Sequence, residues 1–229
     1  MIADTRIGRR TFFLGALTAS AALALPACQT ARPLSVEEAI RRLLYASSEN
    51  AFARLTEPNG FWDRQVANVG LGNLIGVRGD ALTRVLTSQL FRERLQDSFS
   101  DFAIEATERA APAVTDAVRT IGFRNALDLV NGDPRGATAY LRGAMAERLI
   151  DVMVPALADA MDVASDPLLG QLLSAAVGAD VGAIAQNFAG RIDDIIWDAI
   201  GDEEAAIRAN PERTRDPVLI GVFGAARAI

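Results

Sequence analysis

Residues 181–210 read VGAIAQNFAGRIDDIIWDAIGDEEAAIRAN, and this stretch decides the fold class. Its apolar residues recur at multiples of three or four positions: Val181, Ile184, Phe188, Ile192, Ile195, Ala199 and Ile207. That spacing places them on one face of an α-helix, and Pro211 directly afterwards cannot continue the helix. We therefore predict a long helix over residues 181–210 with one buried face.

The same spacing marks a second helix near the start of the chain. Ser35 with Glu38 three residues later has the capping-box pattern of a helix start, and Pro58-Asn59-Gly60 is a typical stop. The expected core face between them consists of Val36, Ile40, Leu43, Leu44, Ala51 and Leu55. Two i,i+4 pairs are expected on the solvent face: Glu37 with Arg41 and Glu38 with Arg42.

Prolines and glycines divide the middle of the chain. We expect helices over residues 82–110, from Pro112 to residue 121, and over 125–130, and a short helix opening at Asp166-Pro167. Asp133 is the expected N-cap of a further helix that runs to residue 163 and is kinked or interrupted by Pro155. The inward residues of the 82–110 helix are expected to be Leu86, Leu90, Phe99, Phe102 and Ala106.

Two segments leave alternatives open. Residues 63–80, rich in Gly and Asn, are expected to form either short helical turns or an ordered loop. The aromatic residues of Asn59-Gly60-Phe61-Trp62 either cap the core from a turn, which we favour, or form a binding platform.

Since no run alternates apolar and polar residues long enough to be a strand, we predict an all-α domain. Its about seven to nine helices would form one compact, bundle-like unit over residues 34–229.

Composition excludes several kinds of chemistry. The 229-residue chain has no His, one Cys, and Arg for all 23 of its basic residues. Ser-His-Asp triads, Cys-His pairs, internal disulfides and lysine-based chemistry are therefore absent. A net charge of −6 without a basic run argues against nucleic-acid binding, because neutralising phosphates supplies most of that affinity. We expect no cofactor and no resident metal.

The N-terminus has the features of an export signal. Arg9-Arg10 precedes an uncharged stretch from Phe12 to Ala27 that is too short to span a bilayer. The Arg pair with its neighbours resembles a twin-arginine export motif. Residues 1–27 are thus expected to be a signal peptide. The alternatives are an ordinary secretory signal and an uncleaved anchor.

The end of this segment indicates lipid attachment. Leu25-Pro26-Ala27-Cys28 resembles a bacterial lipobox, in which Cys28 is lipidated and becomes the first mature residue. Residues 28–33 would then tether the domain to a membrane, because several acyl chains anchor a protein stably. Gln29 after the Cys, rather than Asp, favours the outer membrane over the inner one. We therefore expect a periplasmic, membrane-anchored protein.

Short motifs along the body resemble a known family. They are Leu34–Ala39, Glu49-Asn50-Ala51, Asn59-Gly60-Phe61, Asn125–Gly132, Ala137–Arg142, Glu203-Glu204, Ile207-Arg208, Asn210-Pro211, Arg213-Thr214, Asp216 and Val222-Phe223-Gly224. Their order is similar to that in the bacterial domain of unknown function 4197. The resemblance implies an exported helical protein and supplies no activity or catalytic residue.

Three acidic residues share a face of the 181–210 helix. Asp194, Asp198 and Asp202 follow one another at four-residue spacing, about 5–6 Å apart between Cβ atoms. They would form an oxygen-ligand site for Ca²⁺ or Mg²⁺, bind buried Arg partners, or lie on a solvated face. A single straight helix rarely surrounds a metal, so we expect no metal site.

A charged cluster follows the same helix. Glu203, Glu204, Arg208, Arg213 and Asp216 surround Asn210-Pro211. They would either line a polar pocket, with Arg forks for a carboxylate or phosphate, or lock the helix end by ion pairs. The same two interpretations apply to Tyr140 and Arg142, which line a pocket or pin neighbouring helices. The candidate ligand-binding residues are therefore Tyr140, Arg142, Asp194, Glu204, Arg208 and Arg213.

Together these observations favour a non-catalytic envelope lipoprotein that binds a protein partner or a small ligand. Two alternatives remain: a periplasmic enzyme that uses carboxylates of the C-terminal helix, and a carrier for an apolar small molecule.

Overall fold

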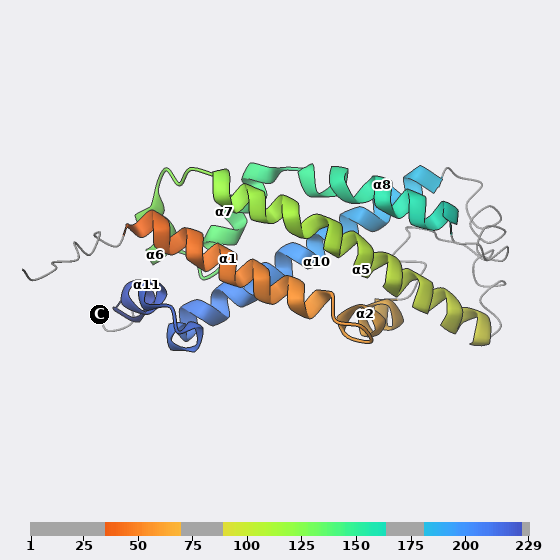
Figure 1. Ribbon diagram of the computed structural model, residues 1–229, viewed down its shortest axis with the longest axis horizontal. Helices are drawn as coiled ribbons and strands as arrows, with labels where there is room; N and C mark the ends of the chain where they lie inside the picture. Colours follow the sequence, from red (N-terminus) through yellow and green to blue (C-terminus); the bar gives the residue numbers. More distant parts are fainter. Residues whose placement is uncertain (1–34, 70–88, 164–180, 226–229) are drawn as a thin grey trace, which may run out of the picture. The chain divides into compact units, whose positions relative to one another are not determined.

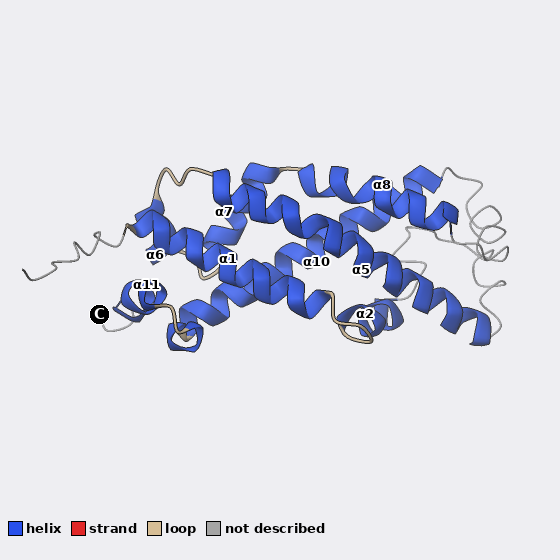
Figure 2. Ribbon diagram, in the orientation of Figure 1, coloured by secondary structure: helices blue, strands red, loops and turns tan. Residues whose placement is uncertain are grey.

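Helices form nearly all of the structure that can be described (Figure 2). The structure is a computed structural model, and it describes residues 35–69, 89–163 and 181–225. Over these ranges the chain forms eight α-helices and no strand, which confirms the predicted all-α class and helix number.

Helices α1 (Val36–Leu55) and α10 (Val181–Ala209) match the two clearest predictions from the sequence. They pack against each other, and the orange and blue ribbons of Figure 1 trace them. Ser35 caps α1 as expected, accepting the backbone N–H of Glu38 at 3.1 Å. The Glu38 carboxylate binds Arg42 at 2.8 Å, so the predicted Glu38–Arg42 pair is confirmed.

The predicted break at Pro112 is wrong. One helix, α5, runs from Gln89 to Thr120 with Pro112 inside it, and the predicted start at residue 82 lies outside the described residues. Pro112 lacks the N–H that would bond the carbonyl of Glu108 one turn earlier. Both residues are exposed, so water can satisfy that carbonyl. Buried residues continue on both sides: Phe99, Ala103, Ala106, Ala110, Val114 and Val118.

Two neighbouring expectations also need correction. After α6 (Ala126–Asn131), which was predicted, the expected helix to residue 163 is divided into α7 (Gly136–Met145) and α8 (Arg148–Val163). The break falls at Ala146, whose φ of 48° leaves the helical region. Pro155 lies inside α8 without ending it, and its side chain is exposed.

The start of α7 also differs from the prediction. Asp133 accepts the N–H of Arg135 at 2.7 Å and so stabilises the turn before the helix, but α7 begins only at Gly136. The cap of α7 itself comes from another helix, as described below. Asp166-Pro167 lies outside the described residues.

Helix α2 (Phe61–Val69) begins where a turn was predicted. It also forms the first part of the 63–80 segment, for which we left helical turns or an ordered loop open. Trp62 is fully buried, and Phe61 meets it edge to face with ring centroids 5.4 Å apart. Trp62 therefore belongs to the core, as we favoured.

The predicted Glu37–Arg41 pair does not form. The Arg41 guanidinium instead donates to the carbonyls of Val118 and Arg119 in the last turn of α5 and to that of Ile121 just beyond it, the latter two at 2.8 and 3.3 Å. It also lies over the Phe123 ring, 5.4 Å from its centroid. A cation suits a helix C-terminus, whose carbonyls carry partial negative charge. Arg41 therefore joins α1 to α5.

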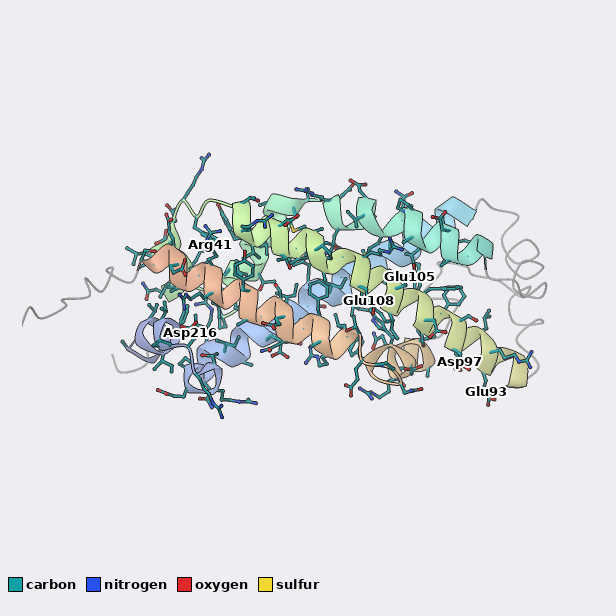
Figure 3. All side chains as sticks on the ribbon, in the orientation of Figure 1. Arg41, Glu93, Asp97, Glu105, Glu108 and Asp216 are labelled. Atoms are coloured by element: carbon teal, nitrogen blue, oxygen red, sulfur yellow. The ribbon has the colours of Figure 1, made fainter. Side chains whose placement is uncertain are left out.

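The chain after α10 turns back along α1 in three short elements: η1 (Pro211–Thr214), α11 (Pro217–Leu219) and the π-helix η2 (Ile220–Gly224). Asp216 caps α11 by accepting the N–H groups of Val218 and Leu219 at 2.7 and 3.3 Å. Figure 3 labels Asp216, which also pairs with Arg42 of α1 at 3.0 Å. The same figure labels four exposed acids spaced along α5: Glu93, Asp97, Glu105 and Glu108.

Candidate functional site

Glu204 of α10 is fully buried and holds the start of α7. Its carboxylate accepts the N–H of Ala137 at 3.1 Å and both the N–H and the hydroxyl of Thr138, at 2.7 and 2.6 Å. These two amides belong to the first turn of α7 and have no partner within their own helix. Glu204 thus acts as an N-cap supplied from a distant part of the chain.

Arg208 completes this buried network. It donates to Glu204 from Nε at 2.9 Å and from Nη2 at 2.7 Å. It also donates to the carbonyls of Leu129 and Val130, at 2.8 and 3.0 Å, near the end of α6. Its guanidinium lies 4.8 Å from the centroid of the Phe223 ring. Four of its five N–H groups therefore have partners, so Glu204 and Arg208 join α6, α7, α10 and η2 and are not free for a ligand.

Tyr140 and Arg142 of α7 also bind neighbouring parts of the fold. The Tyr140 hydroxyl donates to the carbonyl of Gly122 at 2.7 Å. Arg142 donates to Asp193 at 3.0 Å and to Asp194 at 2.6 Å, both on α10. Their contacts therefore pin α7 to the segment after α5 and to α10.

The acidic face of α10 has arginine partners. Arg142 binds Asp194, while Arg135, seven residues earlier, binds Asp202 and lies 3.8 Å from Asp198. The three carboxylates thus meet two guanidinium groups, but these side chains are all exposed, so the face is solvated and its Arg partners are not the buried ones of the second interpretation. Over the described ranges, no three Asp, Glu, His or Cys side chains gather closely enough to hold a metal ion.

Asp193 was not singled out from the sequence, yet it is the buried member of this face. Its carboxylate accepts the indole N–H of Trp197 at 2.8 Å as well as a hydrogen bond from Arg142. Burial raises the pKa of Asp193 above its usual value, and the hydrogen bonds from Trp197 and Arg142 oppose this only in part. The one available signal was its i,i+4 spacing to Trp197.

Arg213 lies in a different place, in a cleft between α1, α10 and η1. The cleft has a volume of about 350 Å³ and is lined by Ala46, Glu49, Asn50, Glu203, Ala206, Ile207, Asn210, Arg213 and Thr214. We call it the α1–α10 cleft. Of the candidate residues, the structure brings only Arg213 into it; Glu203, from the same charged cluster, lines it as well.

A second, shallower groove lies on the other side of α10. It has a volume of about 380 Å³ and is lined by Val130, Gly132, Pro134, Ala205, Arg208, Ala209 and Phe223. Arg208 is its charged residue, and its hydrogen bonds are already directed at protein groups. This groove therefore offers a ligand mainly apolar contacts.

The sequence model of a family described as "Protein of unknown function (DUF4197)" matches residues 31–224. The chain belongs to this family. No curated protein and no solved structure matches the chain. The family therefore confirms the resemblance seen in the sequence but brings no function with it.

The DUF4197 match covers all of the described helical elements, from α1 to η2. Most residues of the α1–α10 cleft come from segments that carry the DUF4197 resemblance: Glu49, Asn50, Glu203, Ile207, Asn210, Arg213 and Thr214. Arg9, Arg10 and Cys28 precede the matched residues and lie outside the described ones. In the described part, no helix is long and apolar enough to cross a membrane.

Proposed function

We propose that this protein is a non-catalytic lipoprotein of the bacterial envelope, anchored through Cys28, that binds a small polar ligand in the α1–α10 cleft. The observation that carries the proposal is the cleft itself. It combines two carboxylates, one guanidinium and two amide side chains around a small apolar floor. Its volume of about 350 Å³ falls in the ~300–1,000 Å³ range of small-molecule sites.

Features of the N-terminus support the location. The Leu25-Pro26-Ala27-Cys28 stretch fits lipid attachment after export, and Cys28 is the single cysteine of the chain. Attachment there would hold the helical domain in the periplasm on the outer membrane, as Gln29 favours.

The chemistry of the cleft supports binding over catalysis. The chain has no His, and its single Cys, Cys28, is not among the described residues that line the cleft, so these offer neither a histidine general base nor a thiol nucleophile. Asp193, whose pKa is raised by burial, lies on α10 but does not line the cleft. The carboxylates of Asp194, Asp202 and Glu204 are held by arginines, which disfavours the alternative of an enzyme built on them.

The polar lining also disfavours an apolar cargo in this cleft. Glu49, Asn50, Glu203, Asn210 and Arg213 would lose hydration against such a molecule without gaining hydrogen bonds.

Native mass spectrometry of the protein purified from its own envelope tests the proposal. We expect a low-mass, non-covalent adduct on the wild type that is lost from Arg213→Gln. Arg191→Gln, an exposed arginine of α10 away from the cleft, is the matched control and should keep the adduct. An adduct that persists in Arg213→Gln, or a protein that carries none, would contradict a ligand site in the cleft.

A further inference from the structure

Two ion pairs join α1 to the part of the chain that forms the other side of the α1–α10 cleft. Arg54 of α1 binds Glu203 of α10 at 3.2 Å, and Arg42 of α1 binds Asp216, the cap of α11, at 3.0 Å. Since Arg54 and Arg42 lie three turns apart on α1, the two pairs tie this helix to the later chain at separate points. All four charges therefore already have partners.

Two oppositely charged side chains that line the cleft form no ion pair within the described part of the chain. Glu49 lines it from α1 and Arg213 from η1, and both side chains are exposed. Neither forms an ion pair with any described residue, and they do not pair with each other. A carboxylate from α1 and a guanidinium from η1 thus remain available to a molecule in the cleft.

The turn that carries Arg213 is held in place before any ligand binds. The backbone N–H of Arg213 donates to the carbonyl of Asn210 at 3.3 Å. The Thr214 hydroxyl donates to the carbonyl of Pro211 at 2.7 Å and accepts the N–H of Asp216 at 3.1 Å. A preformed turn reduces the ordering cost of binding.

The remaining lining limits what fits between the charges. Ala46, Ala206 and Ile207 provide a small apolar surface, while the Asn50 and Asn210 amides offer both donors and acceptors. The cleft therefore suits a small molecule that carries a positive and a negative group beside a short aliphatic part.

We infer that the α1–α10 cleft binds a small zwitterion, either a free amino acid or a short peptide. Its ammonium group lies at Glu49, and its carboxylate is held by the guanidinium fork of Arg213, which matches carboxylate geometry. This inference rests on the proposed function and names the chemical class of its ligand.

Calorimetric titration of the full-length, detergent-solubilised protein tests the ligand class. The probes are the common free amino acids and Ala-Ala, each compared with its N-acetylated and methyl-esterified forms. We expect at least one zwitterion to bind, and either modification, which removes one charge, to weaken binding by about tenfold or more. Comparing the free amino acids with Ala-Ala distinguishes the two sources of the zwitterion.

Two variants assign the charges to their partners. Glu49→Gln should bind the free amine and its N-acetylated form with similar affinity. Arg213→Gln should bind the free carboxylate and its methyl ester with similar affinity. Both residues are exposed, so these variants should fold, which their thermal unfolding curves would verify. Glu37→Gln and Arg191→Gln, exposed residues outside the cleft, are the matched controls and should bind as the wild type does.

Binding that is equally strong for the zwitterion and both blocked forms overturns the inference, as does the absence of binding by every zwitterion at millimolar concentration. If native mass spectrometry meanwhile shows an adduct that Arg213→Gln loses, the proposed function stands with another ligand class. If the adduct is missing as well, both fail.

Discussion

The carboxylate of Glu204 and the guanidinium of Arg208, one turn apart on α10, meet at 2.7 Å with side chains only 0% and 9% exposed. Around them converge the start of α7, the end of α6 and the Phe223 ring of η2. Because each charge satisfies the other along with backbone groups of different helices, this pair has a structural role.

Arg208→Ala should therefore lower the free energy of unfolding by about 3–5 kcal/mol, since it leaves Glu204 buried without its counter-charge. Urea unfolding measures this loss. Arg119→Ala is the control: Arg119 pairs with Asp116 at 2.7 Å with side chains 67% and 55% exposed. Its loss should stay below about 1 kcal/mol.

A double-mutant cycle of Arg208→Ala with Glu204→Gln should give a clear coupling energy between the two. Coupling near zero, together with loss of a bound ligand in the single variants, would instead make this pair a binding site.

Arg41→Met should destabilise the protein although the pair suggested by its spacing does not exist. The substitution keeps an apolar stem but removes the donors to the carbonyls of Val118, Arg119 and Ile121. We expect a loss of about 1–3 kcal/mol in thermal or urea unfolding. Arg109→Met, at an exposed i,i+4 pair on α5, should change stability by no more than about 0.5 kcal/mol; equal losses at the two sites would refute the capping role.

Acid should weaken the attachment of the C-terminal segment through Asp216. Partial burial raises the pKa of Asp216, but hydrogen bonds from Arg42 and from the amides of Val218 and Leu219 outweigh it and lower the pKa below its usual value. The stabilisation is thus complete above the unfolded-state pKa of about 3.9 and is lost as the pH falls through the lower native value. Urea unfolding of Asp216→Asn between pH 7 and pH 2 should lack this part of the acid response.

Asp193 should give a pH dependence of stability opposite in sign to that of Asp216. Burial raises its pKa in the folded protein, so the native state binds the proton more tightly than the unfolded chain. The contribution of Asp193 to the free energy of unfolding therefore declines as the pH rises from about 3.9 to the raised native pKa. Asp193→Asn should remove that decline; a pH profile unchanged in both variants would show that neither carboxyl has the environment described.

Cys28→Ser should abolish lipid attachment and leave the product unprocessed or soluble. Metabolic labelling with palmitate should mark the wild type and not the variant. A wild type that is never labelled would contradict the anchor.

Replacement of Arg9-Arg10 by two lysines should block export if the signal uses the twin-arginine route. Cell fractionation measures the exported share. Undiminished export would favour an ordinary secretory signal and leave the periplasmic location in place.

The sequence predicted the long helices well because their apolar periodicity and their caps are local features. Helices α1 and α10 begin and end close to the predicted residues. The proline at 112 misled the prediction, since on an exposed face a missing hydrogen bond is tolerated when the opposite face remains packed. The break at Ala146 carries no Gly or Pro, so no local signal in the sequence marked it.

In the candidate site, too, local spacing predicted some contacts but not those between distant parts of the chain. The i,i+4 spacing of Glu204 and Arg208 identified the pair, but its burial depends on α6, α7 and η2, which are distant in sequence. Arg41 was assigned to a local partner although it binds residues about 80 positions away. The α1–α10 cleft joins Glu49 to Arg213, and no local pattern connects two such residues.

Amide chemical-shift mapping tests most directly whether the α1–α10 cleft is a ligand site. Isotope-labelled protein would be titrated with the low-molecular-mass fraction of its own envelope. The account predicts shifts concentrated at Ala46, Asn50, Ile207, Asn210 and Thr214. Shifts confined to the groove of Val130, Pro134 and Phe223, or no shifts at all, would contradict it.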